Sequence, residues 1–242
     1  MRDSFEQDLE SIATRLQPAA DAFAGKTVMV VGASGYLGQM FVGVLKNLNA
    51  SYLSSPCEIV ALDSFITGDR LKPTGEHVRF IEHDIREPLD PGTPIDFVVH
   101  AAGVASPAYY RQFPIETIEV STLGTRSLLE LAREHGARAL YLSSSEIYGD
   151  PDSANVPTHE GYRGNVACLG PRACYDESKR MGETLCYIHA RNFDTHVSIV
   201  RPFNVFGPGM RENDFRVLPN FAKSIRTGEP LTLYASGRQT RT

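Results

Sequence analysis

The sequence predicts an α/β fold in which a doubly wound parallel sheet carries helices on both faces. Apolar runs rich in Val, Ile and Leu alternate with longer segments whose apolar residues recur at helical spacing. Such alternation is typical of βαβ units, whose parallel strands are buried on both faces. A turn with regularly spaced glycines, residues 32–38, joins the first apolar run to the helix after it. Ligands of such sheets lie beyond the carboxyl ends of the strands.

The elements follow one another at short intervals. Strands are predicted at 27–31, 58–62, 78–81, 96–100, 139–142 and 196–200, with a short seventh at 231–233. Helices are predicted around 40–48, 114–135, 174–191 and 218–226. The long loops are 64–76 and 149–172, and long loops in compact domains are often functional.

Residues 1–25 are predicted to form an N-terminal helical extension. Its apolar stripe consists of Phe5, Leu9, Ile12 and Leu16. Pro18 is expected to end the helix. The stripe is typical of a buried packing face or a dimer contact.

Composition excludes several classes of protein. The chain has 242 residues, 42% of them hydrophobic and 22% charged, with a formal net charge of −5. This is ordinary globular composition without a basic field for nucleic acid or an anionic membrane. No apolar run approaches the roughly 20 residues that span a bilayer. The acidic N-terminus is unlike a secretory signal, and four cysteines without a C-x-x-C pair are expected to be reduced thiols. We therefore expect a cytoplasmic protein without a metal site.

The glycine turn predicts a dinucleotide site. Its small residues let the backbone approach a pyrophosphate, whose charge the following helix N-terminus favours. Asp63 ends the second strand, where a carboxylate can accept hydrogen bonds from ribose hydroxyls and would repel a 2′-phosphate, so NAD is favoured over NADP. A turn cap is the alternative role for Asp63. The expected cofactor-binding residues are Gly32, Gly35, Tyr36, Leu37, Gly38, Asp63, Asp84, Ile85, Ala101 and Ala102, with Asp84 on the adenine amino group.

The fifth strand runs into LSSSEIYG, residues 142–149, which presents three hydroxyls and a carboxylate. At a strand end this is a candidate catalytic edge, although a Ser-rich turn explains the stretch equally well by itself. Tyr175 and Lys179 lie four residues apart on one helical face. A nearby ammonium and a positively charged nicotinamide would lower the phenol pKa from about 10, so that Tyr175 could accept a proton as hydride leaves an alcohol carbon. The alternative is an ordinary surface pair.

Together these motifs resemble the extended short-chain dehydrogenase/reductases that act on nucleotide sugars (NAD-dependent epimerases and dehydratases). The resemblance covers about residues 26–242 and is nearest to the UDP-glucuronate decarboxylases (UDP-xylose synthases). The motifs are GASGYLG (32–38), LDSFITG (62–68), HDI (83–85), HAAG (100–103), SSSEIYGDP (143–151), GPRACYDESKR (170–180), RPFNVFGP (201–208) and GEPLTLYASGRQTR (228–241).

The resemblance implies a Rossmann-type NAD-binding domain over residues 26–201 and a partial nucleotide-sugar-binding region over 202–242. By position, Ser144 corresponds to the residue that touches the C4 hydroxyl, and Glu146 corresponds to the decarboxylase glutamate. Tyr175 and Lys179 correspond to the base and its partner, both also against the cofactor. The implied catalytic set is Ser144, Glu146, Tyr175, Lys179 and Arg241, and the implied substrate-binding set is Tyr110, Ser145, Arg172, Asn204, Arg216 and Tyr234.

The implied reaction oxidises C4 of UDP-glucuronate, releases carbon dioxide from the β-keto acid and returns the hydride to give UDP-xylose. The Ser145-Glu146 pair lacks the two carboxylates of the 4,6-dehydratases. A nucleotide-sugar 4-epimerase remains an alternative, and a non-catalytic dinucleotide-binding module is an alternative of another class.

Two departures from the family pattern affect the expected substrate site. Gly209 stands where relatives carry Arg, so one phosphate contact is expected to be lost or taken over by Arg211. Residues 167–169 read Ala-Cys-Leu instead of Asn-Pro-Ile. The family continues beyond Thr242, so a further C-terminal segment is expected, and the helices at 114–135 and 174–191 are expected to pair in a homodimer.

Overall fold

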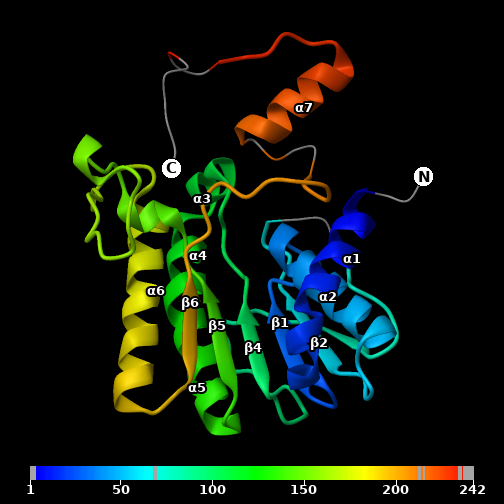
Figure 1. Ribbon diagram of the computed structural model, residues 1–242. Helices are drawn as coiled ribbons and strands as arrows, with labels where there is room; N and C mark the ends of the chain where they lie inside the picture. The colour runs from blue at the N-terminus through cyan, green and yellow to red at the C-terminus, as the bar shows by residue number, and fades with distance from the viewer. Residues whose placement is uncertain (1–3, 68–69, 212–213, 215, 234–235, 237–242) are drawn as a thin grey trace.

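One sheet of six parallel strands forms the centre of the molecule (Figure 1). The computed structural model describes residues 4–67, 70–211, 214, 216–233 and 236. Within them the strand order is β3-β2-β1-β4-β5-β6. Successive strands are therefore added on one side of β1 up to β3 and on its other side from β4 onward. This order confirms the doubly wound parallel sheet. The strands are β1 (Thr27–Val31), β2 (Glu58–Asp63), β3 (Val78–Glu82), β4 (Phe97–His100), β5 (Arg138–Leu142) and β6 (Val197–Val200).

Different helices cover the two faces of the sheet. Successive residues of a strand point to opposite faces. Val28 and Val30 of β1 therefore pack in one core with α1 (Ser4–Leu16) and α2 (Tyr36–Ser51), whereas Met29 and Val31 pack in a second core with α5 (Thr125–His135). The helices are α1 (Ser4–Leu16), α2 (Tyr36–Ser51), α3 (Pro107–Gln112), α4 (Pro114–Glu119), α5 (Thr125–His135), α6 (Ala173–Asn192) and α7 (Val217–Thr227).

The helix predicted over 114–135 is present but interrupted. A π-helical turn, η2 (Val120–Gly124), separates α4 from α5. Gly124 lies where a Cβ would stand 2.5 Å from Cδ1 of Ile85, so the turn brings the backbone close to the loop after β3. Short 3-10 helices occupy η1 (Gln17–Phe23), η3 (Ser145–Tyr148) and η4 (Ser153–Asn155).

The N-terminal extension follows its prediction in outline. The α-helix ends at Leu16, and Pro18 lies in the first turn of η1. Leu9 packs on α2, where a Cβ at Gly43 would stand 2.5 Å from its Cδ1. The extension is therefore built onto the sheet through α2.

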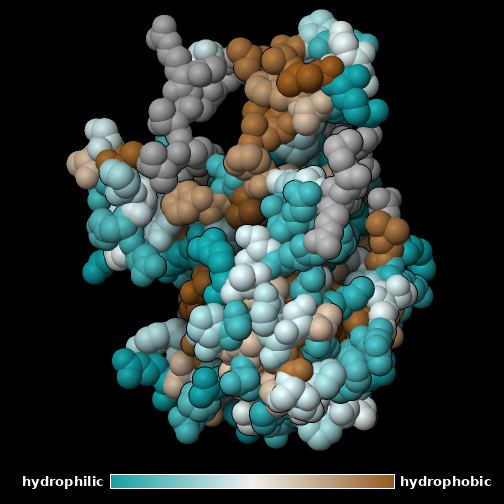
Figure 2. All heavy atoms as spheres, turned by 45° about the vertical axis from the view of Figure 1, so that its right-hand side comes forward, coloured by the Kyte–Doolittle hydropathy of each residue, from teal (hydrophilic) through white to brown (hydrophobic). Residues whose placement is uncertain are grey.

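The seventh strand predicted at 231–233 is wrong. These residues carry no regular structure, and Leu231 and Leu233 are exposed. A strand needs a hydrogen-bonded neighbour, and the sheet of the described residues places none beside them. The segment follows α7, which lies above the sheet, and Figure 2 shows apolar residues gathered there. Across the described part of the chain, no helix is both long and apolar enough to cross a membrane.

Candidate active site

A cavity of about 230 Å³ opens at the carboxyl edge of the sheet, where the strand order reverses. The glycine turn forms one wall, and Ala101 and Ala102, directly after β4, form another. Gly32 has φ +81°, and a Cβ there would lie 2.6 Å from the backbone nitrogen of Ala102. Only glycine fits this position. Gly38 is not part of the wall, because it faces the carbonyl oxygen of Gly32 and lets α2 pack onto the turn.

Asp63 caps the glycine turn and also lines the cavity. Its Oδ2 accepts from the backbone nitrogen of Ser34, and its Oδ1 accepts from that of Phe65, each at 2.9 Å. The carboxylate therefore ties the end of β2 to the glycine turn. It also lines the cavity, where its remaining lone pairs can accept from hydroxyls.

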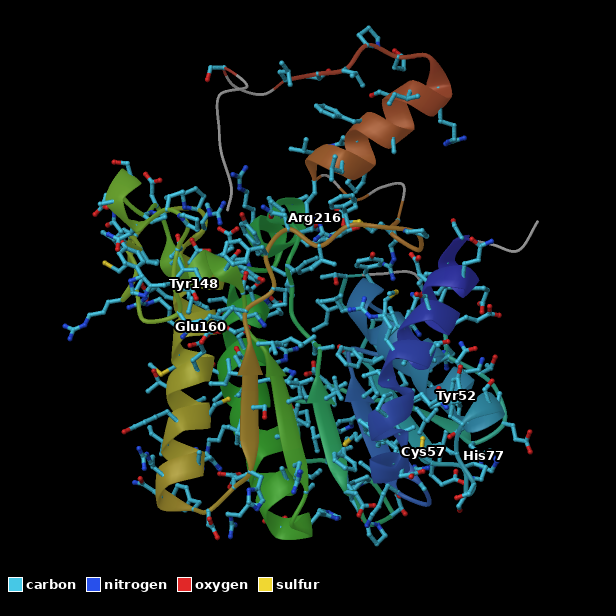
Figure 3. All side chains as sticks on the ribbon, in the orientation of Figure 1. Tyr52, Cys57, His77, Tyr148, Glu160 and Arg216 are labelled. Atoms are coloured by element: carbon cyan, nitrogen blue, oxygen red, sulfur yellow. The ribbon has the colours of Figure 1, made fainter. Side chains whose placement is uncertain are left out.

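The cavity walls suit a dinucleotide. The buried hydroxyls of Ser34 and Ser106 line the cavity, and neither oxygen has a hydrogen-bond partner among the described residues. The N-terminus of α2 also faces the cavity, through Tyr36 and Leu37. Arg211, beside the glycine turn, and Arg216 also line the cavity, the latter paired with Asp214 at 2.9 Å and placed above the strand ends in Figure 3. Helix N-terminus, hydroxyls and guanidinium groups are the partners that a diphosphate needs.

At the end of the cavity expected to hold the adenine, only one of the two predicted residues is part of the wall. Ile85 lines it, as does His83. The carboxylate of Asp84 instead accepts from the guanidinium of Arg86, at 2.7 Å for the shortest bond. Arg86 also pairs with Glu119. The hydrogen bonds from Arg86 lower the pKa of Asp84, so this carboxylate is already engaged within the protein.

Ser144 and Tyr175 come together beyond β5. The Oγ of Ser144 accepts from the backbone nitrogen of Glu146 at 3.2 Å, which caps η3. Ser144 also lies close enough to the Tyr175 phenol to act on its pKa. Burial raises the pKa of Tyr175 to about 12, against the lowering effect of Ser144. Among the protein groups alone, the loss of water outweighs the effect of Ser144.

Lys179 lies on the same side of α6 as Tyr175 and is almost completely buried. Its Nζ donates to the carbonyl oxygen of Leu142 at 2.8 Å and lies 5.1 Å from the centre of the Tyr141 ring. Burial lowers the pKa of Lys179 to about 8. A Cβ at Gly103, on the cavity wall, would stand 3.2 Å from Nζ, so the ammonium lies just behind that wall.

Glu146 is held by an ion pair. Its carboxylate accepts from Arg172, whose guanidinium also approaches Asp176 at 3.4 Å. The two residues predicted for catalysis and for substrate binding thus contact each other. Ser145, between Ser144 and Glu146, is partly exposed, and its backbone nitrogen donates to Pro202 at 3.0 Å.

The other predicted substrate residues are placed differently. Tyr110 is buried and stacks on Tyr175, with ring centres 5.6 Å apart, whereas its neighbour Tyr109 lines the cavity. Asn204 is exposed on the segment after β6. Tyr234 and Arg241 lie outside the described residues.

Sequence reasoning missed Ser34, Ser106 and Tyr109. Signals for two of them were available. Ser34 lies inside the glycine turn, and Ser106 precedes Pro107 at the start of α3, the pattern of a helix N-cap after a strand end. Tyr109 could not be separated from Tyr110 without knowing how the short helix α3 is rotated.

Comparison with known proteins agrees with this geometry. The model of the family "NAD dependent epimerase/dehydratase family" matches residues 28–242. The chain belongs to this family. NAD is accordingly its cofactor, as the glycine turn and Asp63 predict, and neighbouring structures hold NAD.

The curated relatives include UDP-glucuronic acid decarboxylase 1 from Xenopus tropicalis, 38% identical over 97% of this chain and 55% of that protein. UDP-glucuronic acid decarboxylase 6 from Arabidopsis thaliana is 39% identical over 88% of this chain and 61% of that protein. The chain thus spans little more than half the length of these relatives.

Two solved structures share the fold. An epimerase from Methanothermobacter thermautotrophicus is 26% identical with a TM-score of 0.74, covering 93% of this chain and 65% of that one. The dTDP-glucose 4,6-dehydratase DesIV from Streptomyces venezuelae, solved with NAD bound, is 26% identical with a TM-score of 0.71, covering 87% and 65%.

Proposed function

We propose that the protein is an NAD-dependent enzyme that decarboxylates UDP-glucuronate to UDP-xylose through a 4-keto intermediate. The observation that carries the proposal is that Ser144, Glu146 and Tyr175 lie together beyond β5, with Ser144 capping η3 and Glu146 two residues further along. The names of the curated relatives support the same substrate.

In this proposal the residues act on C4 of the sugar. NAD held in the cavity beside the glycine turn would supply the acceptor and later the donor of the C4 hydride. Tyr175 accepts the proton of the C4 hydroxyl, and Ser144 donates a hydrogen bond to the same oxygen. Once C4 is a ketone, the C6 carboxylate is β to it. The C5–C6 bond then breaks, carbon dioxide leaves, and its bonding electrons pass into an enolate whose oxygen lies between Ser144 and Tyr175. A proton then adds to C5, which restores the ketone that takes back the hydride at C4.

Glu146 and Arg172 form the polar side of the sugar site in this proposal. The ion pair with Arg172 fixes the Glu146 carboxylate close to Ser144, and Asp176 shares the same guanidinium. The residue directly before Glu146 is Ser145, so the adjacent acid that would assist the elimination of water is missing from this pair. Residues 26–201 would hold NAD, and residues 202–242, with Arg216 and Asn204, would face the nucleotide.

The test is to incubate the purified protein with UDP-glucuronate and NAD⁺ and to follow carbon dioxide and UDP-pentose by mass spectrometry. We expect both products, and turnover at least about a hundredfold lower in Tyr175→Phe, which removes the proton acceptor. Formation of the C4 epimer without carbon dioxide would indicate an epimerase. Bound NAD without conversion of any nucleotide sugar would indicate a binding module.

The protein is also proposed to form a homodimer in the cytoplasm. Exposed apolar residues lie on α4 and η2 (Ile115, Ile118, Leu123) and on α6 (Met181, Ile188). These helices pack against each other. Exposed apolar residues gathered on neighbouring helices are typical of an interface. Sedimentation equilibrium at micromolar concentration is expected to give twice the chain mass, and a monomer would contradict the proposal. All four cysteines are free thiols, which suits a reducing compartment.

A further inference from the structure

The segment after β6 connects the N-terminal helix with the cofactor cavity. Residues 207–211, here called the strap, cross the carboxyl edge of the sheet toward the first turn of α1 (Figure 1). Every second residue of the strap touches a different part of the chain. Gly207 lies beside the hydroxyl of Tyr36, Gly209 beside the ring of Phe5, and Arg211 beside the glycine turn.

The contact between Gly209 and Phe5 is close. A Cβ at Gly209 would lie 2.8 Å from two ring carbons of Phe5, and the backbone there has φ +86°. Both features require glycine. The Phe5 ring also packs on the core that α1 shares with α2 and β1. The strap therefore contacts a side chain, Phe5, that is itself held by packing against the core.

Arg211 joins the strap to two loops of the cavity. Its Nη1 donates to the carbonyl oxygen of Thr67 at 3.1 Å, and its Nη2 donates to that of Ser34 at 3.3 Å. Both loops and Arg211 itself line the cavity. A guanidinium is thereby held next to the N-terminus of α2, on the side where a diphosphate is favoured.

We propose that α1 is part of the dinucleotide site, with Phe5 holding the strap so that Arg211 contacts the diphosphate of NAD and slows its release. Phe5 and Gly209 are positioning residues, and Arg211 is a binding residue. The inference rests on the proposed assignment of this cavity to the cofactor. A cofactor that takes up and returns the same hydride gains from slow release, because it need not leave between the two steps.

The experiment measures NADH release, independently of turnover, by the loss of bound NADH fluorescence after a chase with excess ADP-ribose. Arg211→Gln is expected to release NADH roughly tenfold faster, because a charge-assisted hydrogen bond is lost. Phe5→Ala is expected to speed release several-fold in the wild-type chain. In the Arg211→Gln chain it should add little, because both changes act on one contact.

Ile12→Ala is the matched control. Ile12 lies about two turns further along α1 and packs on the same core, so its loss loosens the helix without touching the strap. Urea unfolding of each variant compares the stabilities. The inference fails if Phe5→Ala releases NADH no faster than Ile12→Ala, or if the effects of Phe5→Ala and Arg211→Gln simply multiply. Should Phe5→Ala not fold, Phe5→Leu replaces it in the same comparison. A wild-type protein that binds no NADH would instead overturn the cofactor assignment itself.

Discussion

Burial shifts the side-chain pKa values of Tyr175 and Lys179 in opposite directions. It raises the pKa of Tyr175 to about 12 and lowers that of Lys179 to about 8. Both shifts favour the neutral form of the side chain, which is the effect of removing water. The carbonyl oxygen of Leu142 and the Tyr141 ring contact the ammonium of Lys179, and the Glu183 carboxylate is among the groups that raise its pKa.

The lowered pKa of Lys179 predicts a specific dependence of stability on pH. The unfolded chain, with its Lys pKa near 10.4, binds more protons than the folded chain between about pH 8 and 10.4. The Lys179 contribution therefore rises with pH in this window. Between pH 7 and 9.5 the free energy of unfolding of the wild type should increase by roughly 2 kcal/mol relative to Lys179→Met. Urea unfolding at both pH values measures this, and parallel pH profiles of the two proteins would contradict it.

The orientation of single side chains was the least predictable property. Asp84 and Tyr110 lie at the predicted positions, yet Asp84 is held by Arg86, and Tyr110 packs behind Tyr175. In both cases an adjacent residue, Ile85 or Tyr109, lines the cavity. A motif fixes a place along the chain, but the direction of a side chain depends on partners that are distant in sequence.

Secondary-structure elements could be predicted where the physical cause of their formation is visible in the sequence as a pattern of apolar residues. Residues 27–31 are apolar because both faces of β1 are covered, and this requirement is visible as an unbroken run. The run at 231–233, Leu-Thr-Leu, is short and has no strand beside it among the described residues. The π-turn η2 was equally invisible, since it depends on how closely Gly124 approaches Ile85.

The packing of α6 on β5 depends on one small residue. Gly182 faces the hydroxyl of Tyr141 so closely that a Cβ would overlap it. Gly182→Ala should therefore lower the free energy of unfolding by about 1–3 kcal/mol, the usual cost of overpacking. The double variant with Tyr141→Leu should lose less than the sum of the two single changes, because the smaller side chain vacates the contact. Chemical denaturation of the four proteins measures the coupling, and strict additivity would argue against a direct clash.

For the molecule as a whole, cofactor binding should appear as added stability. NAD at a hundredfold excess over its dissociation constant should stabilise the folded state by about 2.7 kcal/mol. NADP at the same concentration should stabilise it less, because the Asp63 carboxylate at the cavity wall repels a 2′-phosphate. Thermal melts with each dinucleotide measure the difference, and Asp63→Ser should reduce it. Equal shifts with both dinucleotides in the wild type would be inconsistent with this role of Asp63.

The two edge strands of the sheet, β3 and β6, differ in how readily they could pair with another strand. β3 forms one margin and carries Arg79 and Glu82, and Glu82 is also bound by Arg70 and Lys72. Charged side chains of this kind discourage the addition of another strand. β6 forms the opposite margin with the sequence Val-Ser-Ile-Val, and its Ile199 and Val200 are exposed. Among the described residues, the charged edge strand β3 therefore discourages backbone pairing with an additional strand, whereas the apolar edge strand β6 could accept one.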